Sequence, residues 1–499
     1  MSVALNHVAA KVHIGDEIEF PADNQFDIIT ADSLDSVGYS KRVVQKSYFE
    51  VLNGALVGRE FWLCKVDFGL GFSICCRLVD EFLSSPQRAN QSLTVIFTTR
   101  SPKKGNDTRR RLQDHLRSTS ATPSPTTRVT FVSESVDLNN LVSVRALSQR
   151  LNEEYPKLDA IVLNAGIGGW TTLNWPKAVW GVLTDIVHEV TWPSYKIAPV
   201  GMVTDYQTTT LADQEPRLGS VFCANVFGHY MLAHNVMPLL RRSGQPNGPG
   251  RIIWVSSIEA TVKLFDIEDL QGLRTKAPYE SSKALTDLLA LTADLPSTAP
   301  FVKSFYSVDD NRTKSGFGRP RVANDESSAP KMYLSHPGIC GTGIIPLSWP
   351  LFYSMIVAFF FARLLGSPWH SVSTYLGACA PVWLALSAQS ILDTAESAYR
   401  QYGGGRVKWG SSCNWRGKDS PLSTEVDGWG HAGVVGPAVV GEDRWRRRKR
   451  GAVDLTAEDK VEFEELGRKC WQKMEELRIE WDKLLDLAEV RPDDFGLGF

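Results

Sequence analysis

Three short apolar runs, each ending in small or polar residues, restrict the fold of this chain more than any other feature. With the residues that follow them, they are 158–163 before Asn164-Ala165-Gly166, 251–255 before Ser256-Ser257, and 332–334 before His336-Pro337-Gly338. Helical stretches lie between them, at 221–240 and 278–293. Apolar runs that alternate with helices are typical of buried parallel strands joined by crossover helices. The sequence therefore predicts an α/β fold built on a doubly wound parallel sheet.

A tyrosine and a lysine one helical turn apart begin the second helical stretch, in Tyr279-Glu280-Ser281-Ser282-Lys283. Residues four apart share a helix face. A free tyrosine has a pKa of about 10, and a nearby positive charge lowers that value. The spacing alone occurs on many solvated helices, but here Ser257 and Asn225 lie upstream. The set predicts a phenol that exchanges a proton with a substrate.

In order along the chain, Asn164-Ala165-Gly166, Asn225, Ser257, Tyr279, Lys283 and Pro337-Gly338 resemble the short-chain dehydrogenase/reductase family. The resemblance covers residues 68–345 and implies a Rossmann-like sheet with helices on both faces. It also implies the catalytic roles. Tyr279 would donate the proton, and Lys283 would lower the tyrosine pKa and bind the nicotinamide ribose. Ser257 would orient the carbonyl, with Ser256 as the adjacent alternative, and Asn225 would hold a water that links Lys283 to solvent.

Further stretches are similar to the fungal 3-keto-steroid reductases within that family: 68–78, 93–105, 164–170 and 424–430. This resemblance implies NADPH-dependent reduction of a 3-ketosteroid to the 3β-hydroxysteroid, during C4 demethylation in sterol (ergosterol) synthesis. Two alternatives stay open. The chain could reduce the ketone of another lipid or a polyketide, or it could act mainly as a non-catalytic partner of sterol-synthesis enzymes.

The glycine fingerprint of this family, T-G-x-x-x-G-x-G, is incomplete. Gly69, Leu70 and Gly71 match its end, but Cys64 and Lys65 replace the threonine and the first glycine. Glycines there let backbone N–H groups approach a pyrophosphate. We expect residues 61–63 to form the preceding strand. Either residues 1–67 are an aberrant amino end, which we favour and which would weaken cofactor binding, or Lys65 adds positive charge near the phosphates.

Basic residues after the second apolar strand indicate the cofactor. That strand ends in Thr98-Thr99-Arg100-Ser101, where Arg100 clusters with Lys103 and Lys104, and no acid appears before Asp107. A guanidinium pairs well with the 2′-phosphate, whereas an NAD site usually has an acid there. We therefore predict NADPH. The alternative is a solvated basic loop.

The resemblance implies further cofactor contacts. Asp137 would accept a hydrogen bond from the adenine amine, and Asn164 would lie beside the cofactor. Pro337-Gly338, Ile339 and Thr342 would line the nicotinamide, where Thr342 could bind the carboxamide or a phosphate.

Two segments are candidates for the substrate pocket. Residues 264–275 lengthen the connection between Ser257 and Tyr279, and we expect them to lie over the substrate mouth, with an ordinary surface loop as the alternative. Residues 170–218 contain several tryptophans and could form the wall of a large apolar site.

Residues 351–361 (LFYSMIVAFFF) form the most apolar stretch. The stretch is shorter than the roughly 20 residues of a spanning helix, so it predicts a helix that dips into one leaflet. A buried lid helix or a dimer contact are the alternatives. The sterol-reductase resemblance implies the cytosolic face of the endoplasmic reticulum or lipid droplets, and association with oxidosqualene cyclase and C4-demethylation enzymes.

The remaining patterns complete the organisation. The net charge of −2 predicts no general attraction to nucleic acid. The basic run 444–450 is interpreted as a solvated loop, with a nuclear signal, a nucleic-acid patch or a membrane contact as alternatives. The cysteine pattern predicts no metal site.

We divide the chain into an atypical segment (1–60), the NADP-binding domain (61–345), apolar substrate or membrane helices (346–400) and a C-terminal extension (401–499). The extension contains a charged helical pattern over 452–487, which we expect to be exposed or to face a partner.

Overall fold

The computed structural model describes residues 25–31, 69–119, 128–207, 215–244, 247–307, 329–345 and 347–487. Eight strands of this part form one sheet in the order β10-β9-β8-β7-β4-β1-β2-β3. The strands are β1 Gln25–Ala31, β2 Ser92–Thr99, β3 Val129–Ser135, β4 Ala160–Leu163, β7 Arg251–Val255, β8 Lys331–His336, β9 Lys408–Cys413 and β10 Asp419–Ser423. All neighbours are parallel except β9 and β10. The strand order reverses between β1 and β4, and the predicted doubly wound sheet is confirmed.

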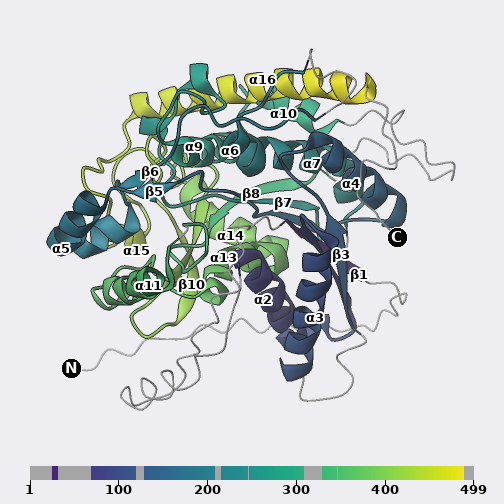
Figure 1. Ribbon diagram of the computed structural model, residues 1–499, viewed down its shortest axis with the longest axis horizontal. Helices are drawn as coiled ribbons and strands as arrows, with labels where there is room; N and C mark the ends of the chain where they lie inside the picture. Colours follow the sequence, from purple (N-terminus) through teal and green to yellow (C-terminus); the bar gives the residue numbers. More distant parts are fainter. Residues whose placement is uncertain are drawn as a thin grey trace.

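Helices cover both faces of the sheet (Figure 1). The longer ones are α2 Leu70–Ser84, α3 Pro102–Thr119, α4 Leu141–Glu154, α5 Trp175–Thr191, α7 Gly228–Asn235, α9 Pro278–Leu291, α10 Ala299–Tyr306, α11 Trp349–Leu364, α13 Cys379–Leu386, α14 Gln389–Arg400 and α16 Ala457–Leu487. The shorter ones are α6 Ser220–Phe222, α8 Met237–Arg241, α12 Thr374–Gly377 and α15 Gly441–Arg444. In Figure 1, α16, α9 and α7 lie above the sheet, and α2, α3 and α13 lie below it.

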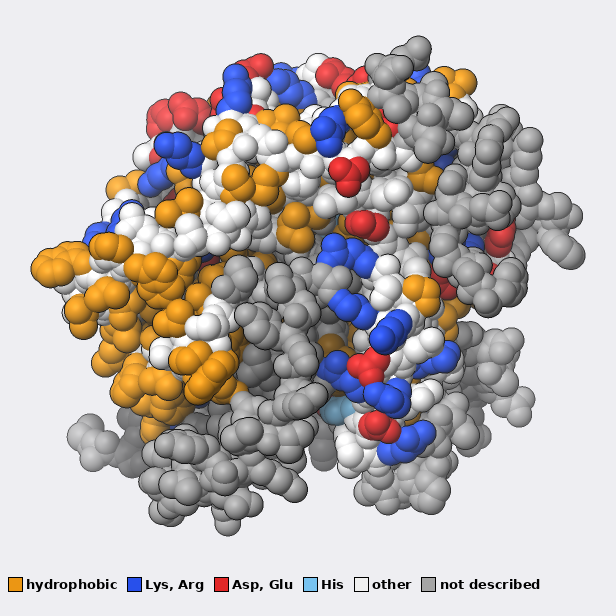
Figure 2. Space-filling view, viewed as in Figure 1, with side chains coloured by type: hydrophobic (Ala, Val, Ile, Leu, Met, Phe, Trp, Pro, Cys, Tyr) orange, Lys and Arg blue, Asp and Glu red, His pale blue; other side chains and the backbone are white. Residues whose placement is uncertain are grey.

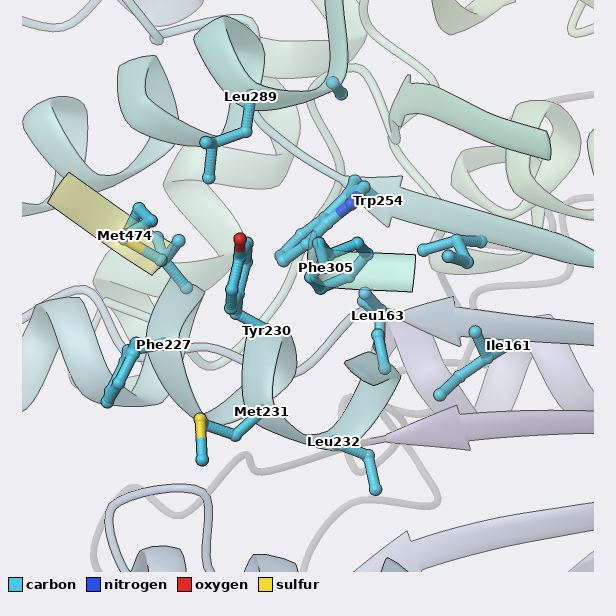
Figure 3. Close-up of a cluster of buried hydrophobic side chains, with 14 of the residues drawn as sticks. Ile161, Leu163, Phe227, Tyr230, Met231, Leu232, Trp254, Leu289, Phe305 and Met474 are labelled. Atoms are coloured by element: carbon cyan, nitrogen blue, oxygen red, sulfur yellow. The ribbon is translucent and has the colours of Figure 1, made fainter. Parts of the chain in front are cut away.

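The central strands bury side chains on both faces because successive residues point in opposite directions. On β7, Ile252 and Trp254 join one hydrophobic cluster, which includes residues of α4, α7, α9 and α16. Ile253 and Val255 join the other, which includes residues of α2, α3, α13 and α14. Figure 3 shows Trp254 beside Phe305 in the first cluster. Burial on both faces explains why these strands are continuous apolar runs rather than alternating ones.

The first strand differs from the prediction. We expected residues 61–63, which lie outside the described residues, to form it. Instead Gln25–Ala31 occupies the position between β4 and β2, where Ile29 pairs with Ile161 on one side and with Ile96 on the other. A strand at the centre of the sheet therefore comes from the segment that we took to be atypical. Residues 32–69 separate the end of β1 from the first residue of α2.

The long C-terminal helix is confirmed, but the expectation that it is exposed or faces a partner is wrong. α16 packs along α9 and α10, and its Trp471, Met474 and Trp481 are fully buried in the first cluster (Figures 1 and 3). The charged pattern suggested exposure, but some of the charged side chains are buried and pair with one another within α16. Arg478 donates to Glu475 and to Asp482, so burial leaves these charges paired.

Residues 264–275 do not form a free loop over the substrate mouth. Phe265, Ile267 and Leu270 pack against the first hydrophobic cluster. Lys473 of α16 donates to the carbonyl oxygen of Ile267 at 3.1 Å. The segment therefore fastens α16 to the body of the domain.

The basic run 444–450 is also held by partners. Arg447 and Arg450 pair with Asp185 of α5, and Arg448 pairs with Glu425. The run is nevertheless solvated, as predicted, because Arg447, Arg448 and Arg450 stay exposed while their ion pairs attach the run to α5 and to Glu425.

α5 and α11 form a separate layer at the side of the sheet (Figure 1). α11 begins at Trp349 and contains the whole apolar stretch 351–361, which was predicted to be helical. Its Phe359 and Ala362 pack against Val187 and Val190 of α5. Throughout the described residues, every helix is too short or too polar to span a bilayer.

Candidate active site

Tyr279 and Lys283 lie on the first turns of α9, beside the carboxyl end of β7. Pro278 occupies the first turn of the helix, where its missing N–H costs nothing. Both side chains are buried, and the Lys283 ammonium lies 5.8 Å from the centre of the Tyr279 ring. Lys283 Nζ donates to the carbonyl oxygen of Val255 at 2.9 Å. This hydrogen bond therefore connects the predicted Tyr279 and Lys283 pair to the predicted end of strand β7.

Ser257 follows β7, and its hydroxyl is near enough to the Tyr279 phenol to act against the rise of the phenol pKa. Its hydroxyl also accepts a hydrogen bond from the backbone N–H of Glu259 at 3.1 Å. Ser256, the alternative catalytic serine, points elsewhere and donates to Asp287 at 2.5 Å. The geometry thus favours Ser257 over Ser256 as the partner of the phenol.

Asn225 lies in a π-helical turn, Cys223–Phe227, between α6 and α7. Such turns are rare and occur often at functional sites. Asn225 is buried, accepts from the Ile167 N–H at 2.7 Å and donates to the Ser282 hydroxyl at 3.0 Å. A Cβ on Gly166 would lie 2.8 Å from Asn225 Oδ1 and 3.9 Å from Lys283 Nζ. The glycine of the predicted Asn-Ala-Gly turn therefore lets both side chains approach the same strand end.

The charge state of the phenol differs from the expectation. Burial, followed by the carboxylate of Glu259, raises the pKa of Tyr279 well above its usual range, while the Ser257 hydroxyl opposes this rise. We expected Lys283 to lower the pKa of the phenol, but its ammonium binds the Val255 carbonyl. At neutral pH Tyr279 is therefore protonated, the form that a proton donor needs.

Lys283 itself is a weakened base. Burial lowers its pKa to about 8, and the charge of Lys408 acts in the same direction, while Asp287 opposes them. Near neutral pH the ammonium form is therefore present but close to its titration range.

The predicted cofactor residues follow neighbouring strands at the same edge. Gly69 precedes α2, and among the described residues no side chain caps the start of this helix, where N–H groups can bind an anion. Arg100 is exposed directly after β2. Asp137 follows β3, and its carboxylate accepts from the Asn139 N–H at 2.9 Å. Pairing of Ala31 with Thr98 puts the end of β1 beside Arg100.

The residues predicted to line the nicotinamide follow β4 and β8. In the part described, Asn164 Oδ1 is buried without a hydrogen-bond partner. Gly338 has φ +67°, and a Cβ there would lie 2.4 Å from the Trp369 carbonyl oxygen. Ile339 exchanges backbone hydrogen bonds with Trp369 and Val372. Thr342 is half-buried four residues after Gly338. An unpartnered amide oxygen and an uncapped helix start fit a dinucleotide that supplies the missing partners.

Comparison with known proteins agrees with this geometry. The chain is 72% identical over 428 residues to the 3-keto-steroid reductase erg27 of Aspergillus fumigatus, covering 85% of this chain and 94% of that protein. It is 39% identical to the Gibberella zeae protein of the same name, with coverage of 85% and 94%. The Schizosaccharomyces pombe protein is 32% identical, with coverage of 72% and 88%. The chain belongs to the 3-keto-steroid reductase family. No family model matches it.

The outer side of the phenol in this reductase is covered by residues that the sequence reasoning did not assign. The ring of Trp170 lies 4.6 Å from that of Tyr279, centre to centre. Lys196 Nζ lies 3.9 Å from the centre of the Trp170 ring and pairs with Glu280 at 2.8 Å and with Glu259. Burial raises the pKa of Glu259, while Lys196 opposes the rise. Trp170 and Glu280 adjoin predicted motifs, but no local pattern indicates Lys196.

A cavity of about 210 Å³ lies on the other side of Trp170. Its lining comes from β5 Thr172–Leu173, which pairs with β6 Lys196–Ile197, from the residues before β5, from the start of α5, and from α11 with the segment that leads into it: Trp170, Thr171, Thr172, Leu173, Trp175, Ile345, Leu347, Ser348 and Leu351. Part of the predicted segment 170–218 thus lines a cavity, while its role as the wall of a large apolar site stays a prediction. Trp170 therefore contacts both this cavity and the ring of Tyr279.

Proposed function

We propose that this chain reduces a 3-ketosteroid to the 3β-hydroxysteroid with NADPH, in the part of sterol synthesis that removes a C4 methyl group. The observation that carries the proposal is a buried, protonated Tyr279 one helical turn from Lys283, with Ser257 buried at the strand end that Lys283 binds. The relatives named 3-keto-steroid reductase support the substrate.

In the proposed reaction NADPH, when bound, supplies the hydride. Ser257 donates a hydrogen bond to the substrate carbonyl oxygen, and Tyr279 gives its proton to that oxygen as negative charge develops. Proton donation requires the phenol form, which burial maintains. Lys283 holds the end of β7 beside α9 through its bond to the Val255 carbonyl oxygen, and Asn225 holds the region around Ile167 and Ser282 in place.

NADPH fits the basic residues at this edge. Arg100 follows β2 beside the end of β1, and Lys103 and Lys104 begin α3. In the described part, the first acid after β2 is Asp107, which pairs with Arg110. A cation at this place suits a 2′-phosphate.

A ketone-reduction assay with purified protein tests the proposal. We expect consumption of NADPH with a C4-methylated 3-ketosterol and formation of the 3β-alcohol. A protein that reduces other lipid or polyketide ketones well, but not this sterol, would exclude the substrate and favour the alternative reductase.

A second candidate function is a mainly non-catalytic partner of oxidosqualene cyclase and of the C4-demethylation enzymes. The long stretch of sequence between β1 and α2 favours this function, because a cofactor site needs a tight turn between that strand and that helix. Growth without added sterol distinguishes the two functions. If a strain with Tyr279→Phe grows where a deletion strain does not, the protein is needed for something other than catalysis.

We also propose that the α5–α11 layer rests on the cytosolic leaflet of the endoplasmic reticulum or of lipid droplets. Figure 2 shows hydrophobic side chains gathered over these helices at the left of the molecule. The most exposed are Trp180, Leu183, Trp349 and Leu365, at 71%, 78%, 74% and 62%. A large exposed apolar patch marks an interaction site, and the adjoining cavity would give a lipid-soluble substrate a direct entrance.

Replacing Trp180 and Leu183 together by glutamate is expected to weaken vesicle binding at least tenfold, because each apolar side chain contributes about 1.5–3 kcal/mol when buried. Co-sedimentation with phosphatidylcholine vesicles measures the effect. Val461→Glu is the matched control, since Val461 is 63% exposed on α16, away from this layer. Equal binding of all three proteins would contradict the proposed surface.

A further inference from the structure

A buried ion pair lies directly behind the catalytic residues. Lys408 begins β9 and Asp287 lies one turn after Lys283 on α9, and both side chains are 2% exposed. Lys408 Nζ lies 2.5 Å from Asp287 Oδ2. Burying two charges costs several kcal/mol each unless they are paired and otherwise satisfied.

The other contacts of this pair all reach the end of β7. Lys408 Nζ donates to the carbonyl oxygen of Ser257 at 2.7 Å. The other carboxylate oxygen of Asp287 accepts from the Ser256 hydroxyl at 2.5 Å. With the bond from Lys283 to Val255, three successive residues of the strand end are each bound by one of these three charged side chains.

These bonds connect three separate elements. Ser257 follows β7, Asp287 lies on α9 with Tyr279, and Lys408 comes from β9, which is 121 residues away from Asp287 along the chain. A shift of β7 against α9 would break the bond to Asp287, and a shift of β7 against β9 would break the bond from Lys408. The distance between the serine hydroxyl and the phenol therefore depends on this pair.

We propose that Lys408 and Asp287 are positioning residues, which fix Ser257 in place against Tyr279 and Lys283 during ketone reduction. The inference rests on the proposed function for the roles of those three residues. Neither Lys408 nor Asp287 needs to touch the substrate or the cofactor.

The pair also acts on the charge of Lys283. Asp287 favours the ammonium form, whereas Lys408 disfavours it. His229, whose pKa is lowered mainly by burial, and Tyr279, whose ring centre lies 5.8 Å from the ammonium, also face Lys283. The pKa of Lys408 is raised by the charge of Asp427 and lowered by that of Lys449. Lys408 in turn lowers the pKa of His336. Removing one member of the pair should therefore shift the pKa of Lys283 in a direction set by which member is lost.

The test uses the full-length protein with Asp287→Asn, Lys408→Met and the double variant. Lysine side-chain NMR follows the titration of Lys283, which is expected near pH 8 in the wild type. We expect Asp287→Asn to lower this pKa and Lys408→Met to raise it. This measurement needs no substrate, so it remains decisive even if the proposed function fails.

Kinetics supply the second readout. The double variant leaves no unpaired charge, so we expect it to fold, yet to lose at least tenfold in kcat because the Ser257 carbonyl has lost its donor. KM for NADPH should change less than threefold. Lys157→Met is the matched control: it breaks the pair with Asp159 at the opposite edge of the sheet and should leave kcat and the pKa of Lys283 unchanged.

The possible results distinguish failure of the positioning role from failure of the proposed function. A double variant with wild-type kcat, or a Lys283 pKa that is equal in both single variants, would overturn the positioning role. A wild-type protein that reduces no ketone would contradict the proposed function instead, and the NMR titration would still decide the inference.

Discussion

Replacement of Tyr279 by phenylalanine is expected to lower kcat for ketone reduction about 100- to 10,000-fold, the usual contribution of a positioned proton donor. The variant removes only the hydroxyl. The ring can keep its contact with Trp170, at 4.6 Å between centres, so the surrounding packing should survive. The loss should therefore be one of chemistry rather than of folding.

Steady-state kinetics and NADPH titration together measure this effect. We expect the Kd for NADPH and the unfolding temperature to stay close to those of the wild type while kcat falls. Tyr399→Phe is a suitable control. It removes the buried hydroxyl of a tyrosine on α14, which donates to Asp443 of α15 away from the site. A Tyr279→Phe protein with kcat within fivefold of the wild type would show that the proton comes from elsewhere.

The catalytic group could be predicted from sequence because each of its parts is local. Tyr279 and Lys283 share a helix face by spacing alone, and Ser257 ends an apolar run. In a parallel sheet the carboxyl ends of neighbouring strands meet at one edge, so strand-end residues from distant parts of the chain come together. The fold class followed from the same alternation of apolar runs and helices.

The residues that sequence reasoning missed depend on long-range pairing. Lys408 lies in a strand whose polar sequence gives no sign of burial, and Lys196 lies in a two-residue strand. Their partners, Asp287 and Glu259, are far away along the chain. No periodicity indicates which distant carboxylate a buried lysine will meet.

The error over the first strand has a different cause. Loops from a strand to the next helix in such folds are usually two to six residues long, so the apolar run nearest Gly69 was chosen. The sheet instead takes Gln25–Ala31, whose backbone pairs with both β2 and β4. Pairing with β2 and β4, rather than proximity to Gly69 along the chain, decides which segment forms this strand.

This strand assignment changes the interpretation of the glycine fingerprint. β1 ends in Thr30-Ala31, and α2 is preceded by Gly69. The fingerprint T-G-x-x-x-G-x-G begins at a strand end and finishes in a helix. Thr30 can thus supply its threonine, Ala31 stands at its first glycine, and Gly69 and Gly71 supply the others. The two halves are separated by residues 35–68 of the sequence.

Deleting residues 35–68 together with Ala31→Gly restores the eight-residue pattern, from Thr30 to Gly71. We expect this variant to bind NADPH about 100-fold more tightly than the full chain. A tight turn aims the N–H groups before α2 at the pyrophosphate, and hydrogen bonds to a charged group contribute about 1.5–3 kcal/mol each, so two restored bonds account for the factor.

Titration of NADPH fluorescence compares the two proteins, and a second shortened chain controls for deletion itself. Removing residues 309–327 shortens the connection between α10 and β8, which enters the sheet at the amino edge, so the Kd should not change. Equal NADPH affinity in the full chain and in the restored variant would mean that the full chain already forms a complete pyrophosphate site. The separated fingerprint would then be no obstacle to catalysis, and the case for a mainly non-catalytic partner would lose its support.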